Sequence, residues 1–245
     1  SSLHVQQSRR PAARDPCAAQ PCRNGGTCKL DRSTAMSYSC DCPLGFAGVN
    51  CQMPLQLLQS VGFNGNGYLE LPSEMLRYDR IDVEPVEFAL AFHTTEDGVL
   101  MYQREAISTP NYGDYILLRV EQGHLVLDWD LGSGLSTIIV DNTIVNDGER
   151  HTVHVKLTRD NTVVMTVDSY YTKTGMTTGL SNLMNADSNI YFGGIPEHYN
   201  FQRLPGLTGC IEQVELTGLP RNFKLGDVAV AGRNTQICRD SRSYH

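Results

Sequence analysis

The chain has 245 residues, of which 40% are apolar and 19% are charged, and its formal net charge is −7. The composition is typical of a globular protein. The negative charge argues against a nucleic-acid partner and weakens the case for heparin, although local basic patches can survive it. No apolar run approaches about 18 residues, so the sequence predicts no membrane-spanning helix.

Residues 1–13 are polar and basic and are expected to be a linker or a tag remnant. After them, six of the eight cysteines follow the pattern C-x4-C-x5-C-x11-C-x-C-x8-C between Cys17 and Cys51. This density predicts a small module held by disulfides, in an oxidising compartment outside the cytosol. Spacing alone allows fifteen pairings. A zinc site is the alternative, but it needs two close cysteine pairs and only Cys40 and Cys42 are close.

The spacing, together with the turn at Gly25-Gly26 and the Pro43-Leu44-Gly45-Phe46 loop, resembles that of an EGF-like module. The resemblance implies the disulfides Cys17–Cys28, Cys22–Cys40 and Cys42–Cys51. It also makes Thr27 a candidate O-fucose acceptor, since it precedes Cys28 in a C-x4-T-C pattern, although it could equally be a plain turn threonine. Only Asp15 offers a carboxylate before the first cysteine, so no calcium is expected in this module.

Beyond residue 56, short runs of alternating apolar and polar residues recur about every ten residues. In 124–131, the clearest run, Leu125, Leu127 and Trp129 share one face, and Asp128 and Asp130 share the other. We expect strands over 87–94, 115–120, 124–131, 136–140, 151–158, 162–168, 189–192 and 210–216. Turn residues (Gly, Asn and Asp) separate these runs, and no segment shows ten residues of helical periodicity. The predicted fold is an all-β antiparallel sandwich.

Several of these segments resemble a laminin G-like (LNS) domain. They are TTEDGVLMY (94–102), GDYILLRVEQGHLVLDWDLGSG (113–134), NDGERHTV (146–153), VMTVD (164–168), NIYFGGIP (189–196) and GLTGCIEQVEL (206–216). The resemblance implies a jelly-roll-type sandwich closed by a Cys210–Cys238 disulfide. Arg150 departs from the family pattern, which often has Trp there. The expected organisation is an EGF-like module at 14–52, a laminin G-like domain at 56–238 and a tail at 239–245.

The resemblance also implies a calcium ion at the rim of the sandwich. Its ligands would be the side chains of Asp114 and Asn185 and the backbone carbonyls of Leu131 and Leu183. Calcium prefers such hard oxygen ligands, and a site with one carboxylate should be weak, with a Kd of about 10⁻⁴–10⁻³ M. Alternatively, Asp114 and Asn185 only cap loops.

A weakly held ion with open positions can accept an oxygen from an acidic sugar. The resemblance therefore implies adhesion to an acidic glycan on α-dystroglycan or a similar receptor, and possible binding of other matrix proteins. Lys156, Arg159 and Arg203 are the candidate basic contacts. The alternative is an adhesion module that binds a partner ectodomain, with calcium only structural. An EGF-like signalling ligand is a weaker third reading.

No catalytic constellation is evident in the sequence. His151 and His154 lie three residues apart on an expected strand and should point to opposite faces. Asp128 and Asp130 share one face, which we expect to be solvated rather than a paired-carboxylate site. Gly132-Ser133-Gly134 lacks the G-x-S-x-G pattern of a nucleophile elbow. The sequence predicts a non-catalytic, secreted module of the extracellular matrix or cell surface, cut from a longer chain.

Overall fold

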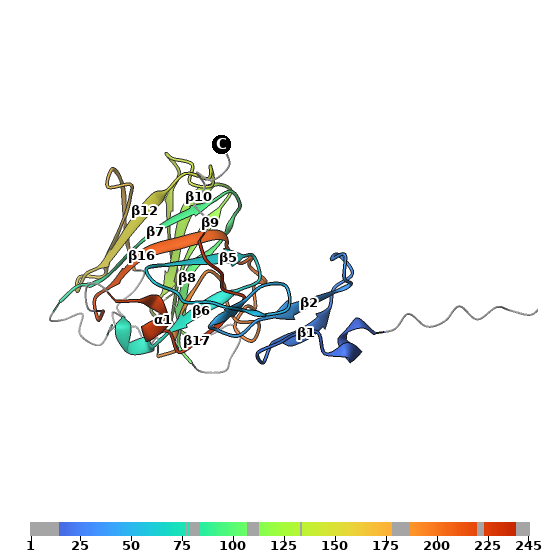
Figure 1. Cartoon of the computed structure of the whole chain (residues 1–245). Helices are drawn as coiled ribbons and strands as arrows, with labels where there is room; N and C mark the ends of the chain where they lie inside the picture. Colours follow the sequence, from blue (N-terminus) through green and yellow to red (C-terminus); the bar gives the residue numbers. More distant parts are fainter. Residues whose placement is uncertain are drawn as a thin grey trace, which may run out of the picture.

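The computed structural model is a β-sandwich with a small cysteine-rich module beside it (Figure 1). It describes residues 15–76, 78, 84–106, 113–132, 134–177, 187–219 and 223–238. Within these residues the pairings between named strands are all antiparallel, so the predicted all-β antiparallel fold is confirmed.

The N-terminal module, residues 15–54, is built from short elements. These are the 3-10 helix η1 (Pro16–Ala19) and the strands β1 (Thr27–Leu30), β2 (Tyr38–Asp41), β3 (Phe46–Ala47) and β4 (Met53–Pro54). β1 pairs with β2, and β3 pairs with β4. Three disulfides hold the module: Cys17–Cys28, Cys22–Cys40 and Cys42–Cys51. They are the pairs that the EGF-like resemblance implies.

Two sheets form the sandwich, residues 55–238. The seven-stranded sheet has the order β11 (Leu135–Val140), β10 (His124–Asp130), β9 (Tyr115–Glu121), β8 (Gly98–Arg104), β15 (Ile190–Phe192), β6 (Tyr68–Leu71), β17 (Ala231–Arg233). The six-stranded sheet has the order β14 (Tyr171–Met176), β13 (Thr162–Val167), β12 (His151–Leu157), β7 (Val86–Thr94), β16 (Thr208–Leu216), β5 (Ser60–Asn64). Two short helices accompany them, η2 (Ser73–Met75) and α1 (Leu225–Val228). The Cys210–Cys238 disulfide ties β16 to the C-terminal segment.

The core lies between the sheets and follows the alternation of the sequence. Leu125, Leu127 and Trp129 of β10 are at most 1% exposed and belong to the main hydrophobic cluster. Trp129 Nε1 donates a hydrogen bond to Thr177 Oγ1 at 3.0 Å, which satisfies the buried indole N–H. The inner face predicted for this strand is confirmed.

The outer face of β10 differs from the prediction. Asp128 is only 7% exposed, and it pairs with Arg119 of β9 and accepts a hydrogen bond from Thr137 of β11 at 2.6 Å. The expectation that Asp128 lies on a solvated face is therefore wrong. Its carboxylate is covered because Arg119 and Thr137, on the two neighbouring strands, both bind it.

The two histidines of β12 point to opposite faces, as expected. His151 is 8% exposed and lies between Asp168 (Nδ1–Oδ2 2.8 Å) and Asp147 (Nε2–Oδ1 3.0 Å). His154 is exposed and lies 3.2 Å from Glu87. The contacts of His151 with Asp147 and Asp168, which we call the His151 clasp, thus join β12 to two turns.

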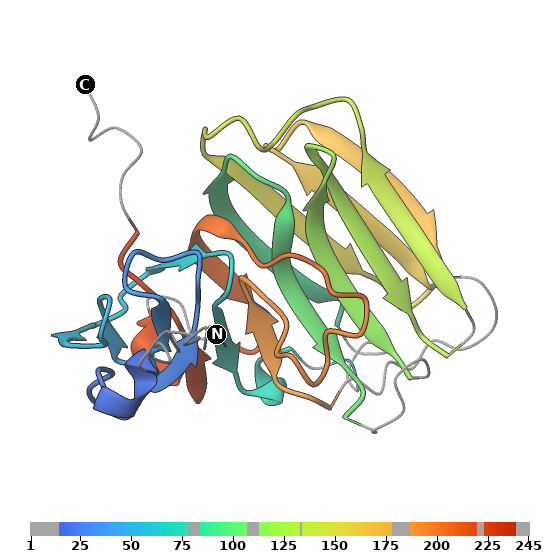
Figure 2. The ribbon, with the colours of Figure 1, turned by 90° about the vertical axis from the view of Figure 1, so that its right-hand side faces the viewer.

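The N-terminal module is fixed to the sandwich through Asn234. Its side-chain oxygen accepts from the Cys42 backbone N–H at 2.8 Å, its own N–H donates to the Cys42 carbonyl at 2.9 Å, and its amide donates to Asp41 at 3.0 Å. Arg233 adds an ion pair with Asp41 at 3.5 Å and a β-bridge to Pro43. Figure 2 shows the blue module next to the red C-terminal segment. The contact therefore holds the two parts together as one body.

Replacing Asn234 should loosen this junction. Asn234 has a φ of 53°, so glycine can adopt its backbone conformation, and Asn234→Gly removes the two side-chain bonds to Cys42 and Asp41 while keeping the backbone bond to Cys42. We expect the free energy of unfolding to fall by about 1–3 kcal/mol and the module to reorient relative to the sandwich, as measured by residual dipolar couplings. Asn161→Gly is the control, since Asn161 also has a positive φ of 63° but no side-chain bond to the described residues. Unchanged residual dipolar couplings in Asn234→Gly would contradict the role of Asn234 in fixing the N-terminal module to the sandwich.

The His151 clasp should make stability depend on pH. Burial acts to lower the pKa of His151, but the hydrogen bonds and charges of Asp168 and Asp147 outweigh it and raise the pKa above its usual value. A raised pKa stabilises the folded state fully below the unfolded value of about 6.5, and that stabilisation is lost as pH rises through the folded pKa.

We therefore expect the difference in Tm between wild type and His151→Gln to be largest near about pH 5.5, below the unfolded pKa, and to shrink as the pH rises through the raised pKa of the folded state. Thermal unfolding followed by circular dichroism across this range measures it. The exposed His154→Gln variant is the control. If the difference in Tm between wild type and His151→Gln grew with pH, the raised pKa of His151 would be contradicted.

Candidate functional site

The pairing of three strands forms one rim of the seven-stranded sheet. Tyr115, the first residue of β9, pairs with Arg104 at the end of β8 and with Asp130 at the end of β10. The next residues outward, Glu105, Asp114 and Leu131, therefore lie at the same rim. The Glu105 N–H donates to the Asp114 carbonyl at 2.8 Å, which extends the ladder by one step.

The rim holds two of the four expected calcium ligands. Asp114 is 5% exposed and Leu131 is 3% exposed, and strand register places them across from each other. A carboxylate and a backbone carbonyl at one strand end fit the donor set that calcium prefers. Leu183 and Asn185 lie outside the described residues. Calcium binding remains a prediction.

The chain returns to this rim directly after those two residues. Asp187 Oδ1 accepts from the Ala106 N–H at 2.6 Å, and the Ser188 N–H donates to the Arg104 carbonyl at 3.0 Å. Among the described residues, no group of three His, Cys, Asp or Glu side chains is arranged to hold a metal ion. A calcium ion here would therefore depend on amide and carbonyl oxygens beside Asp114, as the expected ligand set does.

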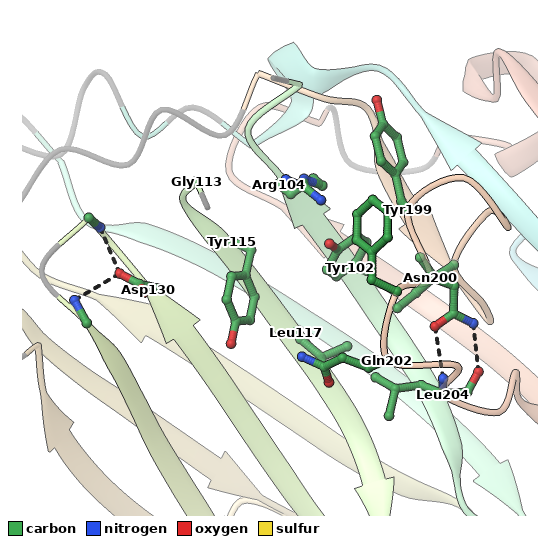
Figure 3. Close-up of a pocket in the computed structure, with 14 residues that line it drawn as sticks. Tyr102, Arg104, Gly113, Tyr115, Leu117, Asp130, Tyr199, Asn200, Gln202 and Leu204 are labelled. Atoms are coloured by element: carbon green, nitrogen blue, oxygen red, sulfur yellow. Dashed lines mark hydrogen bonds between the residues drawn. The ribbon is translucent and has the colours of Figure 1, made fainter. Parts of the chain in front are cut away.

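A cavity of about 480 Å³ opens on the outer face of the sheet beside the rim (Figure 3). It lies between the ends of β8, β9 and β10 and the segment 195–204. Its described lining residues are Tyr102, Arg104, Gly113, Tyr115, Leu117, Asp130, Gly132, Gly134, Ile195, Tyr199, Asn200, Phe201, Gln202 and Leu204. The size is in the range of pockets that hold small organic ligands.

Arg104 is the basic residue of this cavity. It is 5% exposed, and its guanidinium carbon lies 5.5 Å from the ring centroids of both Tyr199 and Phe201. Its Nε donates to the Glu105 carbonyl at 2.9 Å. These contacts fix the charge at the cavity wall. Sequence reasoning missed Arg104; the available signal was that Arg104 and Tyr102 lie two residues apart and so share a strand face.

The three basic residues predicted from sequence lie in different places. Lys156 is on β12 of the other sheet, where it pairs with Glu87 at 2.9 Å, and Arg159 is in the turn between β12 and β13. Neither is among the described residues that line the cavity. Arg203 lies between two lining residues, Gln202 and Leu204, and is exposed. Of the three, Arg203 alone is brought to the cavity edge.

The other residues singled out in the sequence lie away from this rim. Thr27 is exposed at the start of β1, and its O-fucosylation remains a prediction. Arg150, at the position where Trp is common in the family, hydrogen-bonds Gln213 at 2.5 Å and lies 3.5 Å from Glu212 of β16. Polar contacts with β16 thus take the place of aromatic packing there.

Comparison with known proteins agrees with the architecture. The laminin G domain model matches residues 92–219, and the EGF-like domain model matches residues 17–50. The chain belongs to the laminin G domain family. Solved structures support the laminin G fold, although they share too little sequence to show more. The LG4-5 domains of the mouse laminin α1 chain superpose with a TM-score of 0.61 at 22% identity, covering 76% of this chain and 48% of theirs.

Curated relatives match the paired modules of this laminin G family chain. Bovine (Bos taurus) pikachurin is 35% identical over 233 residues, which cover 92% of this chain and 22% of pikachurin. The basement membrane proteoglycan of Caenorhabditis elegans is 29% identical, covering 91% of this chain and 6% of its own length. The chain thus spans about a fifth or less of these relatives.

The relatives are matrix and adhesion proteins rather than enzymes, and EGF-like and laminin G modules are extracellular. None of the helices in the described part of the chain is long and apolar enough to cross a membrane. The chain is therefore an adhesion-type pair of extracellular modules.

Proposed function

We propose that the chain binds Ca²⁺ at the rim of the sandwich and, with that ion, an acidic glycan on a receptor of the α-dystroglycan type. The observation that carries this proposal is the placement of Asp114 and Leu131 at one strand end, beside a cavity that opens on the outer face. The full set of ligands includes Asn185 and Leu183.

The residues of the rim suit this role because a carboxylate and a backbone carbonyl lie at one strand end. The bond from the Glu105 N–H to the Asp114 carbonyl fixes the backbone next to the carboxylate. Gly113, with a φ of 120°, lets the chain turn into β9; a Cβ at this position would lie 2.9 Å from the Glu105 carboxylate. When bound, calcium supplies open coordination positions that accept hard oxygens such as a sugar carboxylate.

Charge explains why a cation would be needed. The chain has a net charge of −7 and would repel an acidic polymer at long range. Within the cavity, Arg104 is held by aromatic rings and supplies one positive charge next to the rim. A divalent cation beside Arg104 would offset most of the negative charge that Asp114 and the other carboxylates bring to this rim. The proposal therefore combines a fixed guanidinium with a cation from the medium.

A protein partner is the second candidate, favoured by the free edge of the seven-stranded sheet. On β11, Leu135 and Ile139 alternate outward and are 55% and 48% exposed. An edge strand that exposes apolar side chains can bind a partner ectodomain. Calcium would then be only structural.

Calcium binding can be measured directly. Calorimetric titration of the chelator-treated protein should show one weak site, with a Kd of about 10⁻⁴–10⁻³ M, and Asp114→Ala should abolish the heat because it removes the carboxylate. Asp227→Ala is the control, since Asp227 is exposed on α1. Near-ultraviolet circular dichroism checks that each variant is folded. Equal heats in wild type and folded Asp114→Ala would contradict the site.

Glycan capture is tested with immobilised, natively glycosylated α-dystroglycan. Binding should disappear with chelator, with enzymatic removal of the acidic glycan and in Asp114→Ala, and it should persist in Asp227→Ala. Binding that survives removal of the glycan would instead support the protein-partner candidate, and Leu135→Lys would then be expected to reduce it.

A further inference from the structure

Two of the expected calcium ligands, Asp114 and Leu131, are direct sequence neighbours of residues that line the cavity. Asp114 stands between Gly113 and Tyr115, and Leu131 stands between Asp130 and Gly132; all four flanking residues line the cavity. Neighbouring residues of a strand point to opposite faces, so the Asp114 side chain leaves these strand ends on the inner side and the cavity side chains leave them on the outer side. A ligand that contacts both the rim and the cavity therefore has to extend over the edge of the sheet at these two strand ends.

Four aromatic side chains line the cavity, those of Tyr102, Tyr115, Tyr199 and Phe201. A second hydrophobic cluster, separate from the core, lies on the outer face of the seven-stranded sheet. Its buried members are Val99, Tyr102, Leu117 and Tyr191, and its partly buried members are Tyr68, Tyr115, Ile195, Tyr199 and Leu204. In a sandwich, this face normally meets solvent. Of the tyrosines in this cluster, Tyr115 and Tyr199 are only partly buried and line the cavity, so they offer ring surface to a ligand.

The segment that completes the cavity is already ordered by its own hydrogen bonds. The Asn200 amide donates to the Leu204 carbonyl at 2.9 Å, and its oxygen accepts from the Leu204 N–H at 2.9 Å (Figure 3). The Tyr199 N–H donates to the Pro196 carbonyl at 2.8 Å. Arg104 contacts the rings of Tyr199 and Phe201 from the sheet side. A ligand would not have to order this segment, which lowers the entropic cost of binding.

Polar groups surround the aromatic surfaces. Tyr115 lines the cavity, and its hydroxyl forms no hydrogen bond with the described residues. Gln202 is exposed at the edge of the cavity. Aromatic faces combined with hydroxyl, amide and guanidinium groups match a ligand that has an apolar face and a polar rim. A sugar ring has this character, with C–H bonds on its faces and hydroxyls around its edge.

We propose that this cavity is a sugar-ring subsite that accepts the ring next to the acidic sugar of the same glycan. The inference rests on the proposed function, because the acidic sugar is assigned to the calcium rim. The ring would stack on Tyr199 or Tyr115, and Tyr115 and Gln202 would bond its hydroxyls. The cavity would thereby select among glycans that carry the same acidic group.

Three variants test the subsite. Tyr199→Ala removes a stacking surface, Tyr115→Phe removes a single hydroxyl, and Tyr170→Ala is the control, because Tyr170 is 80% exposed on the hairpin between β13 and β14. At saturating calcium, we expect Tyr199→Ala to weaken binding to glycosylated α-dystroglycan about tenfold and Tyr115→Phe about threefold. Tyr170→Ala should bind like wild type. Calorimetry should give the same calcium Kd for all three variants and wild type.

A second measurement separates this inference from the proposed function. Saturation-transfer NMR with methyl glucoside and with sodium glucuronate, in excess chelator, detects contact of a sugar with the cavity without calcium. We expect signals from wild type that fall in Tyr199→Ala but persist in Asp114→Ala. If Asp114→Ala alone abolishes receptor binding and Tyr199→Ala and Tyr115→Phe bind like wild type, the subsite is wrong and the calcium proposal stands.

If wild type fails to bind the glycosylated receptor, the proposed function fails. A chelator-resistant sugar signal that depends on Tyr199 would then still assign the cavity to saccharide, as a site independent of calcium. Absence of any Tyr199-dependent effect in both measurements overturns the inference.

Discussion

The register of β9 between β8 and β10 is the constraint on which the site depends. Tyr115 faces Arg104 on one side and Asp130 on the other, so three strand ends meet at one level. A slip of one residue in either pairing would turn every side chain of that strand to the other face. Such a slip would send Tyr115 and Leu117 into the core and bring Ile116 to the surface. Core packing therefore fixes the position of the cavity as well as that of the rim.

Much of the fold was predictable because most strands have one face in the core and the other in solvent. The alternation over 151–158 and 162–168 corresponds to β12 and β13, whose inner residues Val153, Val155 and Met165 are buried. β8 was not predicted as a strand, because all seven of its residues are buried and no alternation remains. β14 and β17 were missed for the opposite reason, since neither contains a buried residue.

The candidate site was less predictable than the fold. Family resemblance led to Asp114 and Leu131, and strand register then places them together. The contact of Arg104 with Tyr199 and Phe201 could not be predicted from the sequence, because about 95 residues separate them in the chain and a loop brings them together. The choice of Lys156 rested on charge alone, whereas β12 places it on the other sheet, where it pairs with Glu87.

The outer face of the seven-stranded sheet connects the module junction with the cavity. Asp41 of the N-terminal module pairs with Arg233, whose guanidinium lies 5.8 Å from the Tyr68 ring. Tyr68 packs edge-on against Tyr191 at 5.9 Å between ring centroids, and Tyr191 lies 6.0 Å from Tyr199, which contacts Arg104.

Contiguity of this kind does not by itself establish energetic coupling. It does mean that a continuous row of side-chain contacts on the sheet joins the junction to the cavity. The N-terminal module is therefore placed at a fixed orientation to the cavity. In a chain of many such modules, this fixed angle would determine the direction in which the cavity faces.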